Sequence, residues 1–176
     1  MKHLIRAAVS TVLPIVLACA SPLVVSPLSG ESGSGGSKSA QNFSASSIQI
    51  QPMDPGDMPI PPEFGVAIYE NLIEQMEKTA KFQHVYRSGD KNAANASDLV
   101  TLRTTAQSFK KGSQKKREVT TIAGSTSITL KVHITDHAGQ TLVNRDVSGK
   151  VRFFGDNLGA TYDFSKKVAT IVRETF

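Results

Sequence analysis

The sequence predicts an α+β fold, a two-layer sandwich in which helices cover one face of a mixed β-sheet. Several runs alternate apolar and polar residues with the period of a half-buried strand. Two longer runs repeat apolar residues at three- and four-residue steps, the period of an amphipathic helix. Their order is strand, helix, strand, then an antiparallel three-strand meander and a C-terminal helix. Because crossovers between parallel strands are nearly always right-handed, the strand-helix-strand start predicts a parallel pair.

The predicted domain covers residues 47–176 and starts with a strand on the alternating stretch 48–51. A proline-rich loop follows, and Pro62 suits the first turn of a helix because its missing N–H has no helical partner there. Val85 and Tyr86 then predict a short second strand. The apolar positions that predict the helix between the two strands are Val66, Tyr69, Ile73, Met76 and Ala80.

Three strand-like runs form the predicted meander, at residues 100–106, 128–134 and 143–153. Asp136 to Gln140 contains a glycine for a left-handed turn position, so it predicts the hairpin between the last two strands. The run "KKGSQKK", residues 110–116, is expected to form the turn between the first two. Thr161 is expected to cap the last helix. The apolar residues along one side of that helix are Phe164, Val168, Ile171 and Val172.

The N-terminal segment resembles an export signal that ends at the only cysteine of the chain, Cys19. Lys2 and Arg6 precede an apolar stretch that is shorter than the ~20 residues a membrane-spanning helix needs. We therefore predict a lipoprotein-type signal peptide at residues 1–18. Residues 16–19 resemble a lipobox, in which the cysteine becomes the lipidated first residue. The alternative is an A-x-A site at residues 18–20, where ordinary signal peptidase would discard the cysteine.

Residues 19–46 are rich in glycine and serine and predict a flexible tether that folding does not require. About 28 residues of such coil have a root-mean-square reach of roughly 29 Å. A tether is useful to a domain whose start is fixed on a membrane, and this favours a lipoprotein over a soluble exported chain or a chain that is not exported. We expect anchoring in the periplasm, on the outer membrane rather than the inner.

Among the residues that could carry chemistry, we find no catalytic signature, and no enzyme activity, metal or cofactor is expected. His133 and His137 are four residues apart, but one lies in a predicted strand and the other in a turn. With no cysteine in the domain and only His84 besides, a zinc site is not predicted. No serine lies in a strand-to-helix nucleophile turn, and no carboxylate pair has a spacing that indicates acid–base catalysis.

One basic cluster is the best candidate for a binding site. It consists of Lys110, Lys111, Lys115, Lys116 and Arg117. The cluster could contact an anionic lipid surface, lipopolysaccharide or an acidic envelope protein. Alternatively, its charges only keep a hairpin tip soluble and guard against edge pairing. Nucleic acid is not an expected partner, because no aromatic residues are interleaved for base stacking. The net charge of +5 falls to +3 when the leader, with Lys2 and Arg6 and no acidic residue, is removed.

The segment "DLVTLRTTAQSFKKGSQKKREVTTIAGSTSITLKVHITDHAGQTL" resembles domain-of-unknown-function family 4410, whose members are uncharacterised bacterial envelope lipoproteins. The resemblance extends more loosely from residue 48 to the last helix. It implies an exported lipoprotein with an α/β domain and implies no activity. The sequence departs from the family pattern at "GSTS", where a Gly-x-Gly-like step is expected. The matching positions are Phe109, Gly112, Ser113, Arg117, Gly124, residues 128–134, Asp136 and Gly139.

These observations favour a non-enzymatic, membrane-anchored interaction or assembly module in the bacterial envelope. One alternative is a soluble periplasmic protein that binds a small ligand, and another is an enzyme whose site assembles only in the fold. A filled core with a flat exposed sheet face would favour the interaction module. A deep pocket lined by convergent polar groups would favour the alternatives. The oligomeric state and the partner do not follow from the sequence.

The lipobox interpretation makes a direct prediction about Cys19. If Cys19 is lipidated, metabolic labelling with a fatty acid such as palmitate marks the wild-type chain and leaves Cys19→Ser unlabelled. Gel fluorography of the two chains, expressed at equal levels, measures the difference. Equal labelling of both chains, or labelling of neither, would show that the cysteine is not the anchor.

Overall fold

The computed structural model describes residues 43–119, 124–151 and 156–176, apart from the side chains of Gln114 and Arg117. The predicted signal peptide, Cys19 and most of the predicted tether lie outside these residues. The strands are β1 (Ser47–Ile50), β2 (His84–Arg87), β3 (Leu99–Lys110), β4 (Thr126–Thr135) and β5 (Thr141–Val151). The helices are α1 (Pro62–Thr79), the 3₁₀ helix η1 (Lys91–Asn95), α2 (Gln114–Val119) and α3 (Gly159–Thr175).

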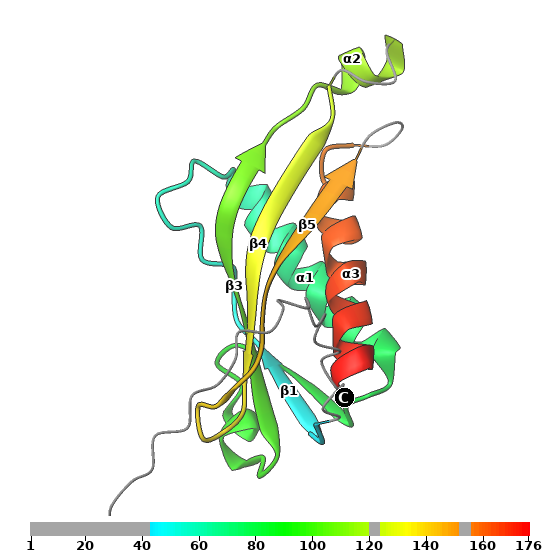
Figure 1. Cartoon of the computed structure of the whole chain (residues 1–176). Helices are drawn as coiled ribbons and strands as arrows, with labels where there is room; N and C mark the ends of the chain where they lie inside the picture. The colour runs from blue at the N-terminus through cyan, green and yellow to red at the C-terminus, as the bar shows by residue number, and fades with distance from the viewer. Residues whose placement is uncertain (1–42, 120–123, 152–155) are drawn as a thin grey trace, which may run out of the picture. The chain divides into compact units, whose positions relative to one another are not determined.

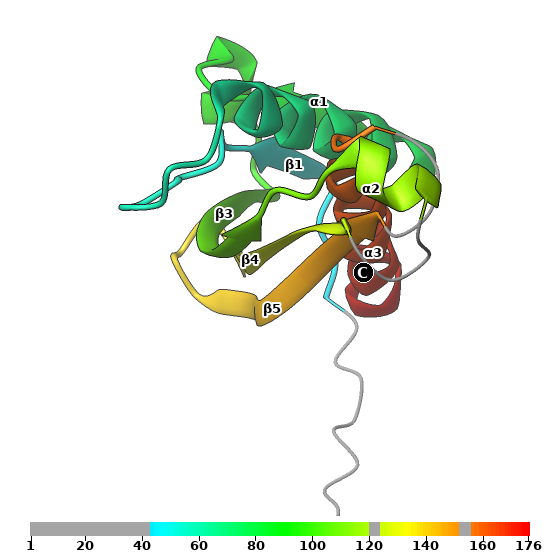
Figure 2. The ribbon, with the colours of Figure 1, turned by 90° about the horizontal axis from the view of Figure 1, so that it is seen from above.

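The strands form one mixed sheet in the order β2-β1-β3-β4-β5. Strand β1 runs parallel to both β2 and β3, whereas β3, β4 and β5 form an antiparallel meander. Helices α1 and α3 pack side by side on one face of the sheet (Figures 1 and 2). The predicted α+β sandwich with a C-terminal helix is therefore confirmed.

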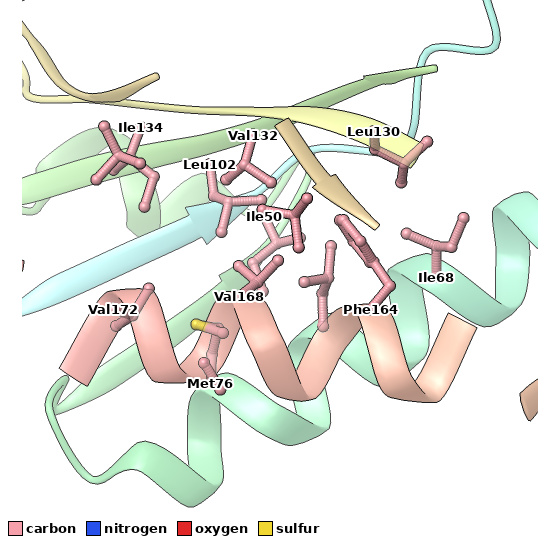
Figure 3. Close-up of a cluster of buried hydrophobic side chains, with 14 of the residues drawn as sticks. Ile50, Ile68, Met76, Leu102, Leu130, Val132, Ile134, Phe164, Val168 and Val172 are labelled. Atoms are coloured by element: carbon pink, nitrogen blue, oxygen red, sulfur yellow. The ribbon is translucent and has the colours of Figure 1, made fainter. Parts of the chain in front are cut away.

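The core lies between the sheet and the two long helices. Strand register aligns Ile48 with Val100 and Leu102 with Ile134, so alternate residues of neighbouring strands face the helices together. Each large apolar side chain buried there contributes about 1.5–3 kcal/mol. The side chains labelled in Figure 3 include Ile50, Ile68, Met76, Leu130, Val132, Phe164, Val168 and Val172, all of which are fully buried.

The short edge strand β2 is fastened to α1 by an ion pair. Arg87 donates to both carboxylate oxygens of Glu70, at 2.6 and 2.7 Å, and its guanidinium lies over the ring of Tyr69. The hydrogen bond from Arg87 holds the pKa of Glu70 below its usual value. Any stability from this exposed pair is therefore present above the ordinary carboxyl pKa and is lost as the pH falls through the lowered one.

Close packing of α3 on β5 requires a glycine at position 149. A Cβ atom on Gly149 would lie 2.0 Å from the carbonyl oxygen of Ala160 and 2.6 Å from the Cβ of Phe164. Any side chain there would push the first turn of α3 away from the strand. Because Phe164 follows in the next turn and is fully buried, that displacement would open the core.

Three local predictions were wrong. The apolar stripe predicted for the first helix is displaced, because α1 buries Phe64, Ile68 and Leu72 and leaves Val66 63% exposed. The segment that contains "KKGSQKK" does not form a simple turn, because residues 114–119 form the short helix α2. This segment, "QKKREV", is rich in residues with high helix propensity. The helix was not predicted because the segment has no apolar stripe. Thr161 does not cap α3, because the helix already begins at Gly159. Its hydroxyl instead donates to the carbonyl of Leu158 at 2.7 Å and accepts from Asn71 of α1 at 2.9 Å.

Among the described residues, contacts with the folded domain already include Phe43, which precedes the predicted domain start at residue 47. The Phe43 N–H donates to the carbonyl oxygen of Thr175 at 2.8 Å, next to the end of α3. The Phe43 ring lies 6.4 Å from the ring of Phe176, which also contacts Phe82 at 5.4 Å. The part of the tether next to β1 thus belongs to the packed domain.

Gly149→Ala is expected to lower the free energy of unfolding by about 1–3 kcal/mol, because the added methyl overpacks the α3–β5 contact. Gly65→Ala is a matched control inside α1, where the nearest atom is the Met53 methyl at 3.6 Å. There the same change should raise stability by up to ~1 kcal/mol, because alanine favours the helix. Urea unfolding of both variants measures the contrast. If the two variants shift in the same direction by similar amounts, the close approach at Gly149 is not a constraint.

Truncation tests the boundary at Phe43. A chain that starts at residue 43 should unfold in urea with the same midpoint as one that starts at residue 20. A chain that starts at residue 47 loses the Phe43 ring and its backbone hydrogen bond, so we expect it to be less stable by about 1–2 kcal/mol. Identical midpoints for all three chains would show that Phe43 adds nothing to the fold.

Candidate functional site

The basic cluster lies at the end of the sheet opposite Phe43, the first residue that the structure describes. Phe43 lines the same surface hollow as Leu99, the first residue of β3. Strand β3 has 12 residues and ends at Lys110. At ~3.3 Å per residue, Lys110 therefore lies roughly 36 Å from the Phe43 end of the sheet. Figure 1 shows α2 at one end of the sheet and the C-terminus near the other.

A surface hollow of about 410 Å³ opens between the end of β3, α2 and the start of β4. It brings together three lysines of the predicted cluster with two serines that no sequence motif marks as site residues. Such a volume is within the ~300–1,000 Å³ range of small-molecule sites. The lining residues are Lys110, Lys111, Gly112, Ser113, Lys116, Gly124 and Ser125.

The backbone under this hollow is held by close packing and hydrogen bonds. A Cβ on Gly112 would lie 2.0 Å from the carbonyl oxygen of Gly124, so only glycine allows the two segments to approach. The N–H of Ser113 donates to that same carbonyl oxygen at 3.1 Å. The N–H of Gly112 donates to the Thr126 hydroxyl at 3.0 Å, and this hydroxyl donates to Asn157 at 2.7 Å. The lysine and serine side chains therefore surround a fixed backbone.

The four described lysines of the cluster are all exposed. Lys111 lies 3.9 Å from Glu63 of α1, and both side chains are about half exposed, so this ion pair is weak. Lys115 lines a neighbouring hollow together with Glu118 and Asn157. The side chain of Arg117 lies outside the described part of the structure, so its place in the site stays a prediction.

Lys150 is a basic residue near the site that the sequence analysis missed. Strand register places Lys110, Ser127 and Lys150 in one row across β3, β4 and β5. With neighbouring strands ~4.8 Å apart, the Cα atoms of the two lysines are roughly 10 Å apart. Strict alternation along the third predicted strand could have placed Lys150 on the open face. Which residues of β3 and β4 lie beside it depends on the pairing register, which the sequence pattern does not give.

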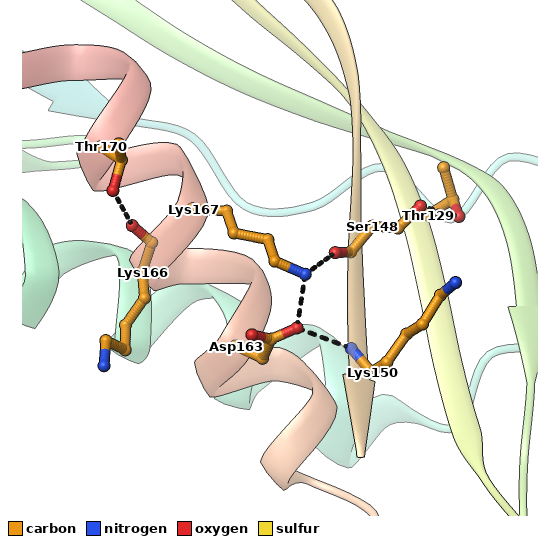
Figure 4. A network of polar contacts seen from close by, with 7 residues as sticks. All are labelled: Thr129, Ser148, Lys150, Asp163, Lys166, Lys167 and Thr170. Atoms are coloured by element: carbon orange, nitrogen blue, oxygen red, sulfur yellow. Dashed lines mark hydrogen bonds and ion pairs between the residues drawn. The ribbon is translucent and has the colours of Figure 1, made fainter. Parts of the chain in front are cut away.

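Helix α3 fixes the backbone of β5 beside Lys150 (Figure 4). The Lys150 N–H donates to Oδ2 of Asp163 at 2.9 Å, and Nζ of Lys167 donates to the carbonyl of Ser148 at 2.8 Å. These bonds occupy edge groups of β5 that could otherwise pair with another strand. The Lys150 side chain extends away from α3.

The sheet face that the helices leave uncovered is polar. Alternate residues of β4 and β5 point to it, including Thr129 and Ser148, whose hydroxyls are 2.8 Å apart. On β2, the rings of His84 and Tyr86 stack with centroids 5.7 Å apart. The opposite face carries the filled core.

The two histidines considered as metal ligands are not brought together. His133 lies on the open face and hydrogen-bonds to the Thr141 hydroxyl at 2.9 Å, whereas His137 is exposed in the β4–β5 turn. Within residues 43–119, 124–151 and 156–176, no group of three or more histidine, cysteine or acidic side chains could hold a metal ion. None of the helices in that part of the chain combines the length and apolar character that a membrane span requires.

Comparison with known proteins finds the fold but no family. No family model matches the chain, and no curated protein matches it. Membership of domain-of-unknown-function family 4410 therefore stays a prediction.

Several solved structures are similar. PelC from Paraburkholderia phytofirmans has a TM-score of 0.55 and 9% identity, and the match covers 74% of this chain and 92% of that one. A hypothetical protein from Chlamydia trachomatis has a TM-score of 0.52 and 8% identity, with 74% and 96% covered. A Xanthomonas campestris protein of family DUF330 has a TM-score of 0.48 and 10% identity, with 78% and 86% covered. At these identities, the first two likenesses show a shared fold.

Proposed function

We propose that the protein is a membrane-anchored interaction module of the bacterial envelope that presents its basic end to an anionic partner. The anchor is the lipidated Cys19, and the outer membrane is favoured over the inner. The observation that carries the proposal is the separation of the two ends of the domain. The chain enters at Phe43, whereas the four described lysines of the cluster lie at the α2 end, roughly 36 Å away along β3.

This layout suits a tethered domain. A tether that ends at Phe43 leaves the lysine end free to meet a partner away from the anchoring surface. The tether adds roughly 29 Å of reach to the length of the domain. The lysines are exposed, and backbone hydrogen bonds tie Gly112 and Ser113, which follow Lys110 and Lys111, to the start of β4.

The two alternatives have weaker support. The hollow beside Phe43 and Leu99, with a volume of about 330 Å³, has Asp98, Asp136 and His137 along its lining. It is an open surface hollow, as is the one beside the lysines, so neither offers a small ligand much burial. An enzymatic role has no supporting arrangement of nucleophile, base and orienting group among the described residues.

The fold itself is compatible with a role in assembly. PelC, which shares this fold, forms a dodecamer. We therefore propose that this chain also acts through contacts with other molecules rather than through chemistry on a substrate.

Charge removal tests the proposed basic end. We expect the full chain carrying Cys19→Ser, which cannot be lipidated, to co-sediment with vesicles that contain anionic lipid at 0.1 M salt. Replacing Lys110, Lys111, Lys115 and Lys116 together with glutamine should abolish most of this binding. Each basic group near an anionic surface is worth at most about 1 kcal/mol, so single changes are too small to measure reliably. Binding should also decline toward 1 M salt, where the Debye length is ~3 Å.

The control replaces Lys81, Lys91, Lys131 and Lys166, which are exposed elsewhere on the domain, with glutamine. This variant has the same net charge as the test variant and should retain most of the binding. If the two variants lose binding equally, net charge rather than the basic end is responsible. If the unchanged chain does not bind anionic vesicles at low salt, the lysines only keep the α2 end soluble.

A further inference from the structure

We propose that the open face of the sheet, which α1 and α3 leave uncovered, binds an anionic polysaccharide. The proposal rests on the proposed function and deepens it, because it names the chemical class of the anionic partner. It also places that partner along the sheet rather than at the α2 end alone. The side chains that carry it form a cationic track, which consists of Lys110 and Arg103 of β3, Lys131 of β4 and Lys150 of β5.

Strand alternation directs these side chains to the open face. Leu130 and Val132 of β4 are fully buried against the helices, so Lys131 between them points the other way. Arg103 likewise lies between two buried neighbours in β3, and both cations are exposed. Lys150 follows the buried Gly149, and its side chain extends away from α3 (Figure 4).

The cationic track is elongated along the strands. Lys110 and Lys150 lie in the row of Ser127. Lys131 is four residues further along β4, and Arg103 lies in the row two residues beyond it. At ~3.3 Å per residue, the track is roughly 20 Å long, with Lys131 roughly 13 Å from its first row. Such spacing fits an extended chain with repeated negative charges better than a single compact anion.

Few negative charges on the protein oppose the cationic track. No ion pair among the described residues includes any of its four members. Asp146 is the only acidic residue of β3, β4 and β5, and the register places it directly opposite Lys131. Four cations against one carboxylate leave this face positive at neutral pH, so it attracts a polyanion.

Hydroxyl groups lie between the charges. Thr129 and Ser148 form a row between the two lysines of the first row and Lys131, and their hydroxyls are 2.8 Å apart. Thr105 lies beside Lys131 on β3. Each hydroxyl has one donor and two acceptor sites, so capacity remains after the bond between Thr129 and Ser148. These groups can hydrogen-bond to sugar hydroxyls, while the cations make charge-assisted bonds to carboxylates.

The open face lacks the side chains that other anionic partners would use. The large apolar residues exposed in the described part of the chain are Val66, Tyr162 and Val119, which belong to α1, α3 and α2. A membrane would therefore find no apolar anchor on the sheet. Protein interfaces are enriched in aromatic residues and depleted in lysine and serine at their centre, whereas the middle of this face is lysine, serine and threonine. A hydrated chain of acidic sugars matches both the charges and the hydroxyls.

The first test is calorimetric titration of an oligogalacturonate, a linear sugar with one carboxylate per ring, into the full chain carrying Cys19→Ser. We expect saturable binding at 0.1 M salt that weakens toward 1 M salt. The double variant Arg103→Gln, Lys131→Gln should weaken it about tenfold or more, the loss expected when charged hydrogen bonds are removed. The control Lys81→Gln, Lys166→Gln changes the net charge equally at exposed positions beside α1 and on α3, and should change affinity less than about twofold.

Asp146 provides a test of opposite sign. Its carboxylate lies opposite Lys131 and repels a polyanion, so Asp146→Asn should strengthen oligogalacturonate binding about twofold or more. Glu174→Gln makes the same charge change near the end of α3 and should have little effect. If both variants tighten binding equally, net charge rather than the cationic track sets the affinity, and the proposal is wrong.

Two other polymers separate sugar recognition from charge attraction. Polyglutamate carries carboxylates without hydroxyls, and dextran carries hydroxyls without charge, so each should bind about tenfold more weakly or less. Thr129→Val, Ser148→Ala leaves the net charge unchanged and should weaken oligogalacturonate binding about threefold or more, with polyglutamate affinity unaffected. Urea unfolding of each variant identifies any loss caused by misfolding.

The proposal is overturned if the unchanged chain shows no saturable binding of oligogalacturonate, or if polyglutamate binds as tightly. It is also overturned if the remote lysine variant loses as much affinity as the Arg103 and Lys131 variant. Anionic vesicles report separately on the α2 end. A chain that binds vesicles there but not oligogalacturonate keeps the proposed function and loses this inference. A chain that binds oligogalacturonate but no vesicles supports the sheet site and rejects the lipid contact.

Discussion

The contact between Gly149 of β5 and the first turn of α3 determines how closely the two layers pack. The Ala160 carbonyl oxygen lies 2.0 Å from the position that a Cβ atom on residue 149 would take, and the Phe164 side chain is fully buried in the core. The same approach brings Asp163 and Lys167 onto the outer edge of β5, where they bond to the backbone of Lys150 and Ser148. The absence of a side chain at Gly149 thus allows α3 to cover the core and to hydrogen-bond to the edge strand β5. A second glycine, Gly112, does the same for the backbone beneath the lysines.

The sheet also separates Phe43 from the lysine cluster. Phe43 packs against the end of α3, whereas the lysines gather where β3 leaves the sheet and β4 begins. Since β3 is continuous between these ends, their separation is set by a hydrogen-bonded strand rather than by a flexible loop. A tethered domain with this geometry would keep the proposed anchor and the proposed binding surface apart.

Alternation and helical periodicity predicted most of the fold correctly because they report directly on burial. Ile128, Leu130, Val132 and Ile134 lie in the core as expected, as do Ile73 and Met76 of the predicted helical stripe. Val66 of that stripe is exposed, because α1 buries Phe64, Ile68 and Leu72 instead. Helix α2 was missed because a short charged segment has no apolar stripe to mark it. Thr161 is a good capping residue by type, but α3 begins before it, and its hydroxyl bonds to Leu158 and Asn71 instead. Capping preferences are local, whereas the helix start depends on packing against β5.

The sequence by itself determined the α+β class, the basic character of residues 110–117 and the prediction of a lipidated Cys19 followed by a tether. These depend on local composition and periodicity, which the chain carries before it folds. Only the tertiary structure decided that Lys110, Lys116, Ser113 and Ser125 surround one hollow and that Lys150 lies in the same row as Lys110. The reason is that strand register and the glycine contacts at positions 112 and 149 bring together residues that are distant in sequence, and neither leaves a periodic signal along the chain.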